Sequence, residues 1–325
     1  MYLLTQLTVY SLKKQVDAIL LIAGLVLLLL GGDFLLRASV AAAMRWQVPK
    51  VVVGMTIVSF ATSLPELITS IRAALAGYPD LSLGNVVGSN IANLGFVLGL
   101  VLLFSKIDIQ KSFYQFDWPI VFGVSLLLLL FIHDGTISQT EGILLLCGLV
   151  AVMYYLIRFQ PPVIAEQAAE VISIKSWWWI ITFVTLGSLG LAFGSQWLVK
   201  GAIGLARAFD VSERIIGITL VSIGTSLPEL VASGIAIVRK ESGISIGNLI
   251  GSNLFNILTV VGLTAVIHPL NVVDDRLLSF DIWVMLGFAF ILLPLVLIPK
   301  RLQLNWHEGI ILSVAYISYL VVTLA

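Results

Sequence analysis

The strongest constraint on this chain is an internal duplication. Residues 54–66 read GMTIVSFATSLPE and residues 217–229 read GITLVSIGTSLPE, with nine identities in thirteen positions. Residues 84–93 (GNVVGSNIAN) and 247–256 (GNLIGSNLFN) repeat a second motif at the same spacing of 163 residues. Because two motifs repeated at one fixed spacing indicate two copies of one structural unit, we expect both halves of the chain to fold alike.

The composition places both copies in a membrane. Of 325 residues, 59% are apolar and 11% are charged, whereas soluble domains carry about 25% charged residues. A membrane-spanning helix needs roughly 20 predominantly apolar residues, and the sequence offers about ten such stretches, so we predict an all-α polytopic membrane protein. The predicted spans lie near residues 17–44, 48–76, 83–104, 117–132, 138–157, 177–206, 211–238, 243–267, 280–298 and 305–324.

The orientation of the two copies follows from the number of spans. Five spans per copy is an odd number, so the second copy enters the membrane in the opposite orientation to the first. We predict ten transmembrane helices as two inverted five-helix repeats, residues 1–160 (motif region 54–93) and 177–325 (motif region 217–256), joined by a polar cytoplasmic linker at 161–176. With the N-terminus outside, eleven Lys and Arg residues fall in the cytoplasm and seven outside. Since cytoplasmic loops are enriched in Lys and Arg, we expect both termini outside.

Each copy places one glutamate in the middle of an otherwise uncharged span. Burying the carboxylate of Glu66 or Glu229 there costs roughly 2.5 kcal/mol or more, and intramembrane carboxylates are functional by default. Pro65 and Pro228 precede them, and proline lacks the N–H that would bond the carbonyl four residues earlier. We therefore expect a broken helix in each half. Broken helices at matched positions of inverted halves are typical of a transporter's binding site.

An alternative explains the first of these motifs by helix capping. Ser63 and Glu66 have the Ser-x-x-Glu spacing of a capping box, in which the serine caps the restarting half-helix and the glutamate bonds back to the cap. A cap needs no charge, so we favour an ion-binding role for Glu66. Capping and binding are also compatible with each other.

The second motif in each copy adds uncharged oxygen atoms. Asn85, Ser89 and Asn93 are four residues apart, which places them in one stripe on a helix. Gly84 and Gly88 form a small-xxx-small face, for which close helix packing is the better interpretation. Polar side chains on the glutamates' side of a membrane core need partners, so we predict that four of them ligate an ion. These four are Ser89, Asn93, Ser252 and Asn256.

Together these residues predict an oxygen-rich site without His or Cys. Hard cations prefer such ligands, and calcium takes about 6 to 8 oxygens in flexible geometry. Two glutamates would balance the calcium charge, and once calcium leaves, their mutual repulsion requires other cations or protons to replace it. This is the physical basis for antiport. The single cysteine, Cys147, excludes a thiolate site, and the chain has no basic run of the kind that binds nucleic acid.

At its two motifs the chain resembles the calcium/cation antiporter superfamily, and within it the bacterial sodium/calcium exchangers. The shared elements are paired GxTxxSxxTSLPE and GNxxGSN motifs in a five-plus-five helix layout. The resemblance implies cation sites between helices 2 and 3 and helices 7 and 8, with helices 1 and 6 sliding across the rest in alternating access. By motif position it implies that Glu66 and Glu229 bind both calcium and sodium, and that backbone oxygens of Thr62 and Thr225 bind calcium. The sodium ligands that it implies are Ser63, Ser89, Ser226 and Ser252, with carbonyls near Ser59 and Ser222.

Two departures from the superfamily bear on the coupling ion. Many relatives have an acid where this chain has Asn256, which argues against potassium coupling and removes a protonation site. Proton-coupled relatives typically have GNxxE where this chain has GNVVG and GNLIG, which favours sodium. We therefore predict sodium/calcium antiport by a monomer in a bacterial inner membrane, without a cofactor or an obligatory protein partner.

Three alternatives remain open at this stage. An antiporter of the same fold coupled to protons or potassium would transport without sodium. A cation channel would need a continuous pore and would carry single-channel current. An intramembrane hydrolase using Ser63 or Ser226 would need a base that the sequence does not position, so we expect a transporter and not an enzyme.

Overall fold

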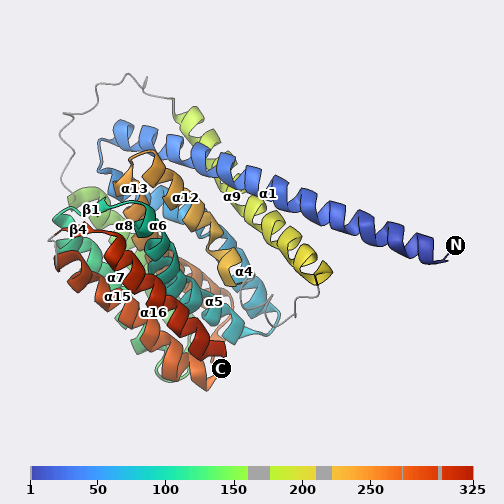
Figure 1. Ribbon diagram of the computed structural model, residues 1–325. Helices are drawn as coiled ribbons and strands as arrows, with labels where there is room; N and C mark the ends of the chain where they lie inside the picture. Colours follow the sequence, from blue (N-terminus) through green and yellow to red (C-terminus); the bar gives the residue numbers. More distant parts are fainter. Residues whose placement is uncertain (1, 160–175, 210–221, 273, 299–301, 325) are drawn as a thin grey trace.

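A computed structural model of the chain describes residues 2–159, 176–209, 222–272, 274–298 and 302–324, which form helices and short two-residue strands (Figure 1). Several helices contain a π-helical turn, labelled η. The first half contains α1 (Tyr2–Trp46), α2 (Lys50–Val53), η1 (Gly54–Val58), α3 (Ser59–Thr62), α4 (Leu64–Leu75), α5 (Pro79–Ala92), η2 (Asn93–Val97), α6 (Leu98–Phe104), β1 (Ile107–Asp108), η3 (Phe113–Asp117), α7 (Trp118–Ile132), β2 (Thr136–Ile137) and α8 (Gln139–Phe159). The second half contains α9 (Trp177–Ala208), α11 (Ser222–Thr225), α12 (Leu227–Val238), α13 (Ser242–Phe255), η5 (Asn256–Val261), α14 (Gly262–Ile267), β3 (Leu270–Asn271), η6 (Leu277–Asp281), α15 (Ile282–Leu297), β4 (Gln303–Leu304) and α16 (Trp306–Leu324).

The helices confirm the predicted membrane architecture. Within the described residues, eight helices are long and apolar enough to cross a membrane, and the bent pair Lys50–Thr62 and Leu64–Leu75 forms a further span. The remaining predicted span, 211–238, is represented by α11 and α12, and its beginning at 211–221 lies outside the described residues. The linker predicted at 161–176 also lies outside them except for Ser176, so the domain boundaries stay a prediction.

The first helix extends beyond its apolar span. The span predicted near residues 17–44 agrees with the candidate span Lys14–Trp46, and the helix α1 that contains it begins at Tyr2. Residues 2–16 contain neither glycine nor proline, so no residue in this segment breaks the helix before it enters the apolar run. The hydrophobic pattern marks the membrane-spanning part of a helix, and the helix itself ends where the backbone is interrupted.

The inverted orientation of the two halves is visible in the packing of α1 against α9, which lie side by side in Figure 1. A Cβ atom added at Gly24 would lie 2.7 Å from the carbonyl oxygen of Gly194, and one added at Gly187 would lie 2.9 Å from that of Gly31. Gly24 of α1 contacts Gly194 of α9, whereas the later residue Gly31 contacts the earlier residue Gly187. The two helices are therefore antiparallel. Gly24 and Gly187, and likewise Gly31 and Gly194, are equivalent positions of the repeat, and the antiparallel packing of equivalent helices confirms an inverted repeat.

The two halves are interlocked. β1 pairs antiparallel with β4, and β2 pairs antiparallel with β3, so each pair contains one strand from each half. α6 packs against α16, and α14 packs against α8. A Cβ at Gly309 would lie 2.8 Å from the carbonyl of Gly99, and one at Gly142 would lie 2.7 Å from that of Gly262. The last helix of each half is therefore held by the third helix of the other half.

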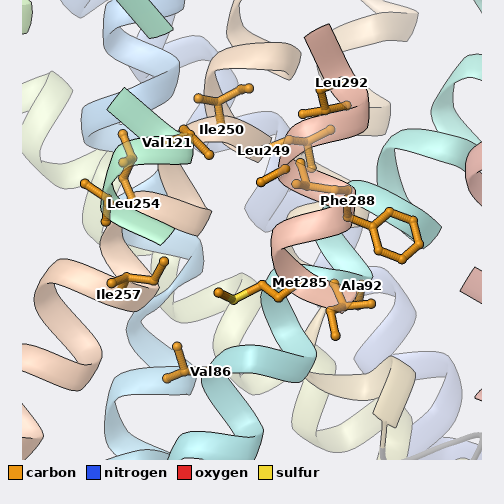
Figure 2. Close-up of a cluster of buried hydrophobic side chains, with 14 of the residues drawn as sticks. Val86, Ala92, Val121, Leu249, Ile250, Leu254, Ile257, Met285, Phe288 and Leu292 are labelled. Carbon is orange, nitrogen blue, oxygen red and sulfur yellow. The ribbon is translucent and has the colours of Figure 1, made fainter. Parts of the chain in front are cut away.

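The main apolar core excludes α1 and α9 among the described residues. It fills the space between α5, α7, α13 and α15 and includes Val121, Leu254, Met285 and Phe288 (Figure 2). Leu28 and Leu35 of α1 instead join a smaller cluster with Leu191 of α9 and residues of α3 and α12. The pair α1 and α9 thus forms a separate layer laid across the rest of the bundle.

Candidate functional site

Each intramembrane glutamate follows a break in its helix. α3 ends at Thr62 and α4 begins at Leu64, and the segments on either side of Ser63 are bent by 45°. Ser63 has a ψ of 1° and Ser226, which precedes α12, has a ψ of 3°, both away from regular helix. A proline occupies the first turn of each half-helix. The predicted broken helices are therefore confirmed in both halves.

The two glutamates lie in the first turns of α4 and α12, at the ends where helix dipoles favour negative charge. Glu66 and Glu229 are each 1% exposed, and none of their four carboxylate oxygens has a hydrogen-bond partner among the described residues. They are close enough for their charges to repel each other. Buried polar groups are normally paired, so the four unpaired carboxylate oxygens make this region a candidate ligand site.

The serines at the breaks do not cap their half-helices. The side chains of Ser63 and Ser226 make no capping hydrogen bond, and both hydroxyls are buried without a partner within the described part of the chain. The capping box considered as an alternative is therefore not formed in this structure. The hydroxyls instead add two further unpaired oxygen atoms beside the glutamates.

The second motif supplies amide oxygens from both halves. The Nδ2 atom of Asn93 donates to Oδ1 of Asn253 at 3.2 Å, and that of Asn256 donates to Oδ1 of Asn90 at 3.0 Å. The Oδ1 atoms of Asn93 and Asn256 are buried and have no partner among the described residues, and the same holds for the hydroxyl of Ser89. η5, which begins at Asn256, packs beside α4, and η2, which begins at Asn93, packs beside α12. Both amides thus lie on elements next to the half-helices that carry the glutamates.

Thr62 and Ser252 connect the halves through hydroxyl contacts. The Thr62 hydroxyl lies 3.2 Å from both Asn248 Oδ1 and Ser252 Oγ, and 3.3 Å from the carbonyl of Ser59. That carbonyl also accepts from the Ser63 N–H at 2.9 Å. The Thr62 hydroxyl has one proton, so it can donate to only one of these three acceptors at a time. The side chain of Ser222 lies outside the described residues, and Thr225 borders the cavity described below.

The sequence motifs missed a pair of serines behind the site. Asn85 Nδ2 donates to Ser70 Oγ and Asn248 Nδ2 donates to Ser233 Oγ, each at 3.0 Å. Ser70 and Ser233 are fully buried and lie one turn after the two glutamates. The sequence does contain a pattern that points to these serines. The same residue type occurs at both positions, 163 residues apart, and each serine lies four residues after a glutamate.

A cavity of about 510 Å³ between α1, α4, α9 and α11 leads to the broken helices. Its wall includes Pro65 and Thr225 of the two TSLPE motifs, and Asp17, Lys200 and Arg207 nearer one end of the layer formed by α1 and α9. The cavity therefore connects the region of the glutamates to that end of the molecule.

The opposite end of this layer is held by ion pairs. Asp33 of α1 contacts Arg37 at 2.7 Å and Arg239, which follows α12, at 2.8 Å. Lys50 contacts Glu241 at 2.7 Å. The repeat equivalent of Asp33 is Gln196, which lines the cavity at the other end and carries no charge. Asp33 thus joins helices of the two halves at this end of the molecule.

The chemistry of the assembled site is that of oxygen ligands. Two carboxylates, two amide oxygens and several hydroxyls come together at the breaks in the helices, and hard cations such as calcium and sodium prefer oxygen donors.

Comparison with known proteins agrees with this chemistry. The model of the family described as sodium/calcium exchanger protein matches residues 16–158 and 178–325. The chain belongs to the sodium/calcium exchanger family. It is therefore a membrane antiporter of cations.

Individual relatives match over nearly the full chain. YrbG of Escherichia coli (strain K12), named as an inner membrane protein, is 34% identical over 312 residues, which cover 93% of this chain and 94% of YrbG. MaX1 of Methanosarcina acetivorans, named as a sodium/calcium exchanger, is 28% identical over 353 residues, covering 94% of this chain and 98% of MaX1. A structure of the sodium-calcium exchanger NCX_Mj soaked with 100 mM Na⁺ and 10 mM Sr²⁺ has a TM-score of 0.81 at 28% identity and covers 95% of this chain and 98% of that one.

Proposed function

We propose that this antiporter exchanges sodium for calcium, and that both ions bind between Glu66 and Glu229. The observation that carries the proposal is the set of unpaired buried oxygens on Glu66, Glu229, Asn93 and Asn256, two repeat-equivalent pairs at the centre of one membrane protein. Unpaired buried polar atoms are costly, and a bound cation would satisfy them together. We assign the hydroxyls of Ser63, Ser226, Ser89 and Ser252 and the oxygens of Thr62, Thr225, Ser59 and Ser222 to the surrounding ligand set.

The charge of the site favours calcium as one substrate. Two carboxylates balance one divalent cation, and calcium accepts about 6 to 8 oxygens in flexible geometry, whereas magnesium demands a near-ideal octahedron. When calcium leaves, Glu66 and Glu229 repel each other in a medium of low dielectric. Sodium ions entering the site relieve this repulsion, which couples the departure of one ion to the arrival of the other.

Sodium is supported as the partner ion by two observations. The motif GNxxE of proton-coupled relatives is replaced by GNVVG and GNLIG, which removes a carboxylate that could carry a proton. MaX1, which matches 94% of this chain, is named as a sodium/calcium exchanger. The name of YrbG supports an inner membrane location, and the distribution of Lys and Arg supports both termini outside.

Access to the site is proposed to alternate through movement of α1 and α9. These two helices form a layer separate from the main core, and their contact surface is lined by glycines. Small residues allow two helix backbones to approach closely, because no side chain of their own stands between the helices at those positions. The cavity at Lys200 and Arg207 then corresponds to the outward-facing entrance, and the ion pairs of Asp33 and Lys50 close the cytoplasmic side.

Transport by purified protein in liposomes tests the coupling ion. Sodium-loaded proteoliposomes diluted into sodium-free buffer with calcium-45 are expected to accumulate calcium, and the accumulation should stop when choline replaces internal sodium. An imposed pH gradient without sodium is expected to drive no uptake. Uptake driven by the pH gradient alone would replace sodium by protons, and uptake that requires internal potassium would assign potassium.

Breaking the ion pair between Asp33 and Arg239 is expected to shift the access equilibrium. An exposed pair contributes roughly 0.2–1 kcal/mol, so Arg239→Gln should reduce the population open at the cavity by up to about fivefold. In a Cys147→Ser background, a cysteine introduced at Thr69, which lines the cavity, should react correspondingly more slowly with a membrane-impermeant thiol reagent. Lys240→Gln is the control, since the structure records no ion pair for Lys240 within the described residues. Equal labelling rates in both variants would contradict a latch at Asp33.

A further inference from the structure

Four asparagines cross-link the two halves where α5 and η2 meet α13 and η5. In this asparagine tetrad, Asn90 Nδ2 donates to the backbone carbonyl of Asn253 and Asn253 Nδ2 donates to that of Asn90, each at 3.3 Å. Asn93 Nδ2 donates to Asn253 Oδ1 at 3.2 Å and Asn256 Nδ2 donates to Asn90 Oδ1 at 3.0 Å. Asn90 and Asn253, and likewise Asn93 and Asn256, are equivalent positions of the repeat, so the network is two-fold symmetric. All four side chains are buried.

The chemistry of the amide group gives the inner and outer members of the tetrad different tasks. Asn90 and Asn253 use both ends of their side chains, because the Nδ2 atom binds the opposite backbone and the Oδ1 atom accepts from the opposite amide. Asn93 and Asn256 use only the Nδ2 atom, and their Oδ1 atoms are left without a partner among the described residues. The direction of these two oxygens is thus set by a residue of the other half.

We infer that Asn90 and Asn253 are positioning residues of the cation site: Asn253 orients the amide of Asn93, and Asn90 orients the amide of Asn256, so that both Oδ1 atoms face the ion. The inference rests on the proposed function of the site. η2 lies beside α12 and η5 lies beside α4, so each oriented oxygen belongs to an element next to a half-helix that carries a glutamate.

The tetrad also explains why these positions carry amides and not carboxylates. An aspartate at position 256 has no Nδ2–H to donate to Asn90 Oδ1, so the Asn90 amide would have to turn its own Nδ2 toward the aspartate and give up its bond to the Asn253 carbonyl. An aspartate at position 253 would likewise lose its donor to the Asn90 carbonyl. The amides keep the formal charge of the site at that of the two glutamates.

A crossed set of double-mutant cycles on the purified full chain tests the inference, with calcium alone as the titrated ion. Loss of a residue that orients a metal ligand typically lowers metal affinity by roughly 10- to 100-fold, and we expect Asn253→Ala and Asn90→Ala each to weaken calcium binding about tenfold. Asn253→Ala should have little further effect in an Asn93→Ala protein but its full effect in an Asn256→Ala protein. Asn90→Ala should show the opposite pattern. A residue that only supports the fold would weaken binding equally in both backgrounds.

The controls separate this inference from folding and from the site assignment. Thermal unfolding in a calcium chelator identifies variants that fail to fold. If an alanine variant fails, Asn253→Ser or Asn90→Ser replaces it, and the same loss of calcium affinity and the same coupling pattern are expected because the short serine side chain does not reach the partner amide. If Asn253→Ala, or Asn90→Ala, were coupled equally to Asn93→Ala and to Asn256→Ala, the inference would be overturned while the glutamate site stayed intact. Calcium binding that survives Glu66→Gln and Glu229→Gln would instead overturn the site itself.

Discussion

Replacing Glu66 or Glu229 by glutamine is expected to abolish sodium-driven calcium uptake. Each carboxylate balances half the charge of a calcium ion in a buried site, and removing one partner of a buried charge pair typically costs about 3–5 kcal/mol. This corresponds to a loss of calcium affinity of roughly 10²- to 10³-fold or more. Calcium-45 uptake into sodium-loaded proteoliposomes, with the parent protein and both variants side by side, measures the effect.

The same substitution has a second, opposite consequence for the ion-free protein. In a sodium-free buffer with a calcium chelator the two buried carboxylates repel each other, and glutamine removes that repulsion. The unfolding temperature of each variant without calcium should therefore exceed that of the parent, whereas the stabilisation caused by added calcium should be lost. A variant that is merely misfolded would show a lower unfolding temperature in both conditions.

Glu141→Gln is the matched control for the glutamate variants. Oε2 of Glu141 accepts from the N–H and the hydroxyl of Ser138 at 2.7 and 2.8 Å, in an exposed capping box at the start of α8. A glutamine can fill the same capping role, so transport should stay within about twofold of the parent for a change that affects only a cap. Uptake that survives in both Glu66→Gln and Glu229→Gln would show that the ion binds elsewhere.

The second large effect is expected at the crossing of the two halves, where Gly251→Val should prevent folding into a transport-competent form. A Cβ at Gly251 would lie 2.5 Å from the Cα and 2.6 Å from the carbonyl oxygen of Met55, which are backbone atoms that cannot turn away. α13 would have to separate from η1, at a cost of about 3 kcal/mol or more for overpacking of this kind. Gel filtration and thermal unfolding of the detergent-purified protein are expected to show aggregated or strongly destabilised material.

Gly287→Val in α15 provides the comparison for this prediction. A Cβ at Gly287 meets no described atom within 4 Å, so the larger side chain should be accommodated at the surface of the helix. Its unfolding temperature and calcium uptake should remain close to those of the parent. Normal folding and transport in Gly251→Val would show that η1 and α13 do not approach each other as closely as the structure places them.

The sequence alone predicted the fold class, the inverted repeat and the broken helices, because these depend on local properties. Apolar length decides whether a helix spans a membrane, and Pro65 and Pro228 each lack the N–H that would bond the carbonyl four residues earlier, a property of the residue itself. An odd number of spans per copy requires inversion regardless of how the helices pack. Glu66 and Glu229 were identifiable for the same reason, since a carboxylate in an apolar span stands out without any knowledge of its neighbours.

The tertiary structure alone decided which groups meet across the two halves. No spacing in the sequence indicates that Asn253 holds the amide of Asn93, that Asn248 joins Thr62 to Ser233, or that the pair α1 and α9 packs apart from the main core. An amide side chain is equally compatible with ligation, packing and cross-linking until its partners are placed. Its role depends on distances between residues far apart in the chain, and these distances exist only once the inverted halves have crossed.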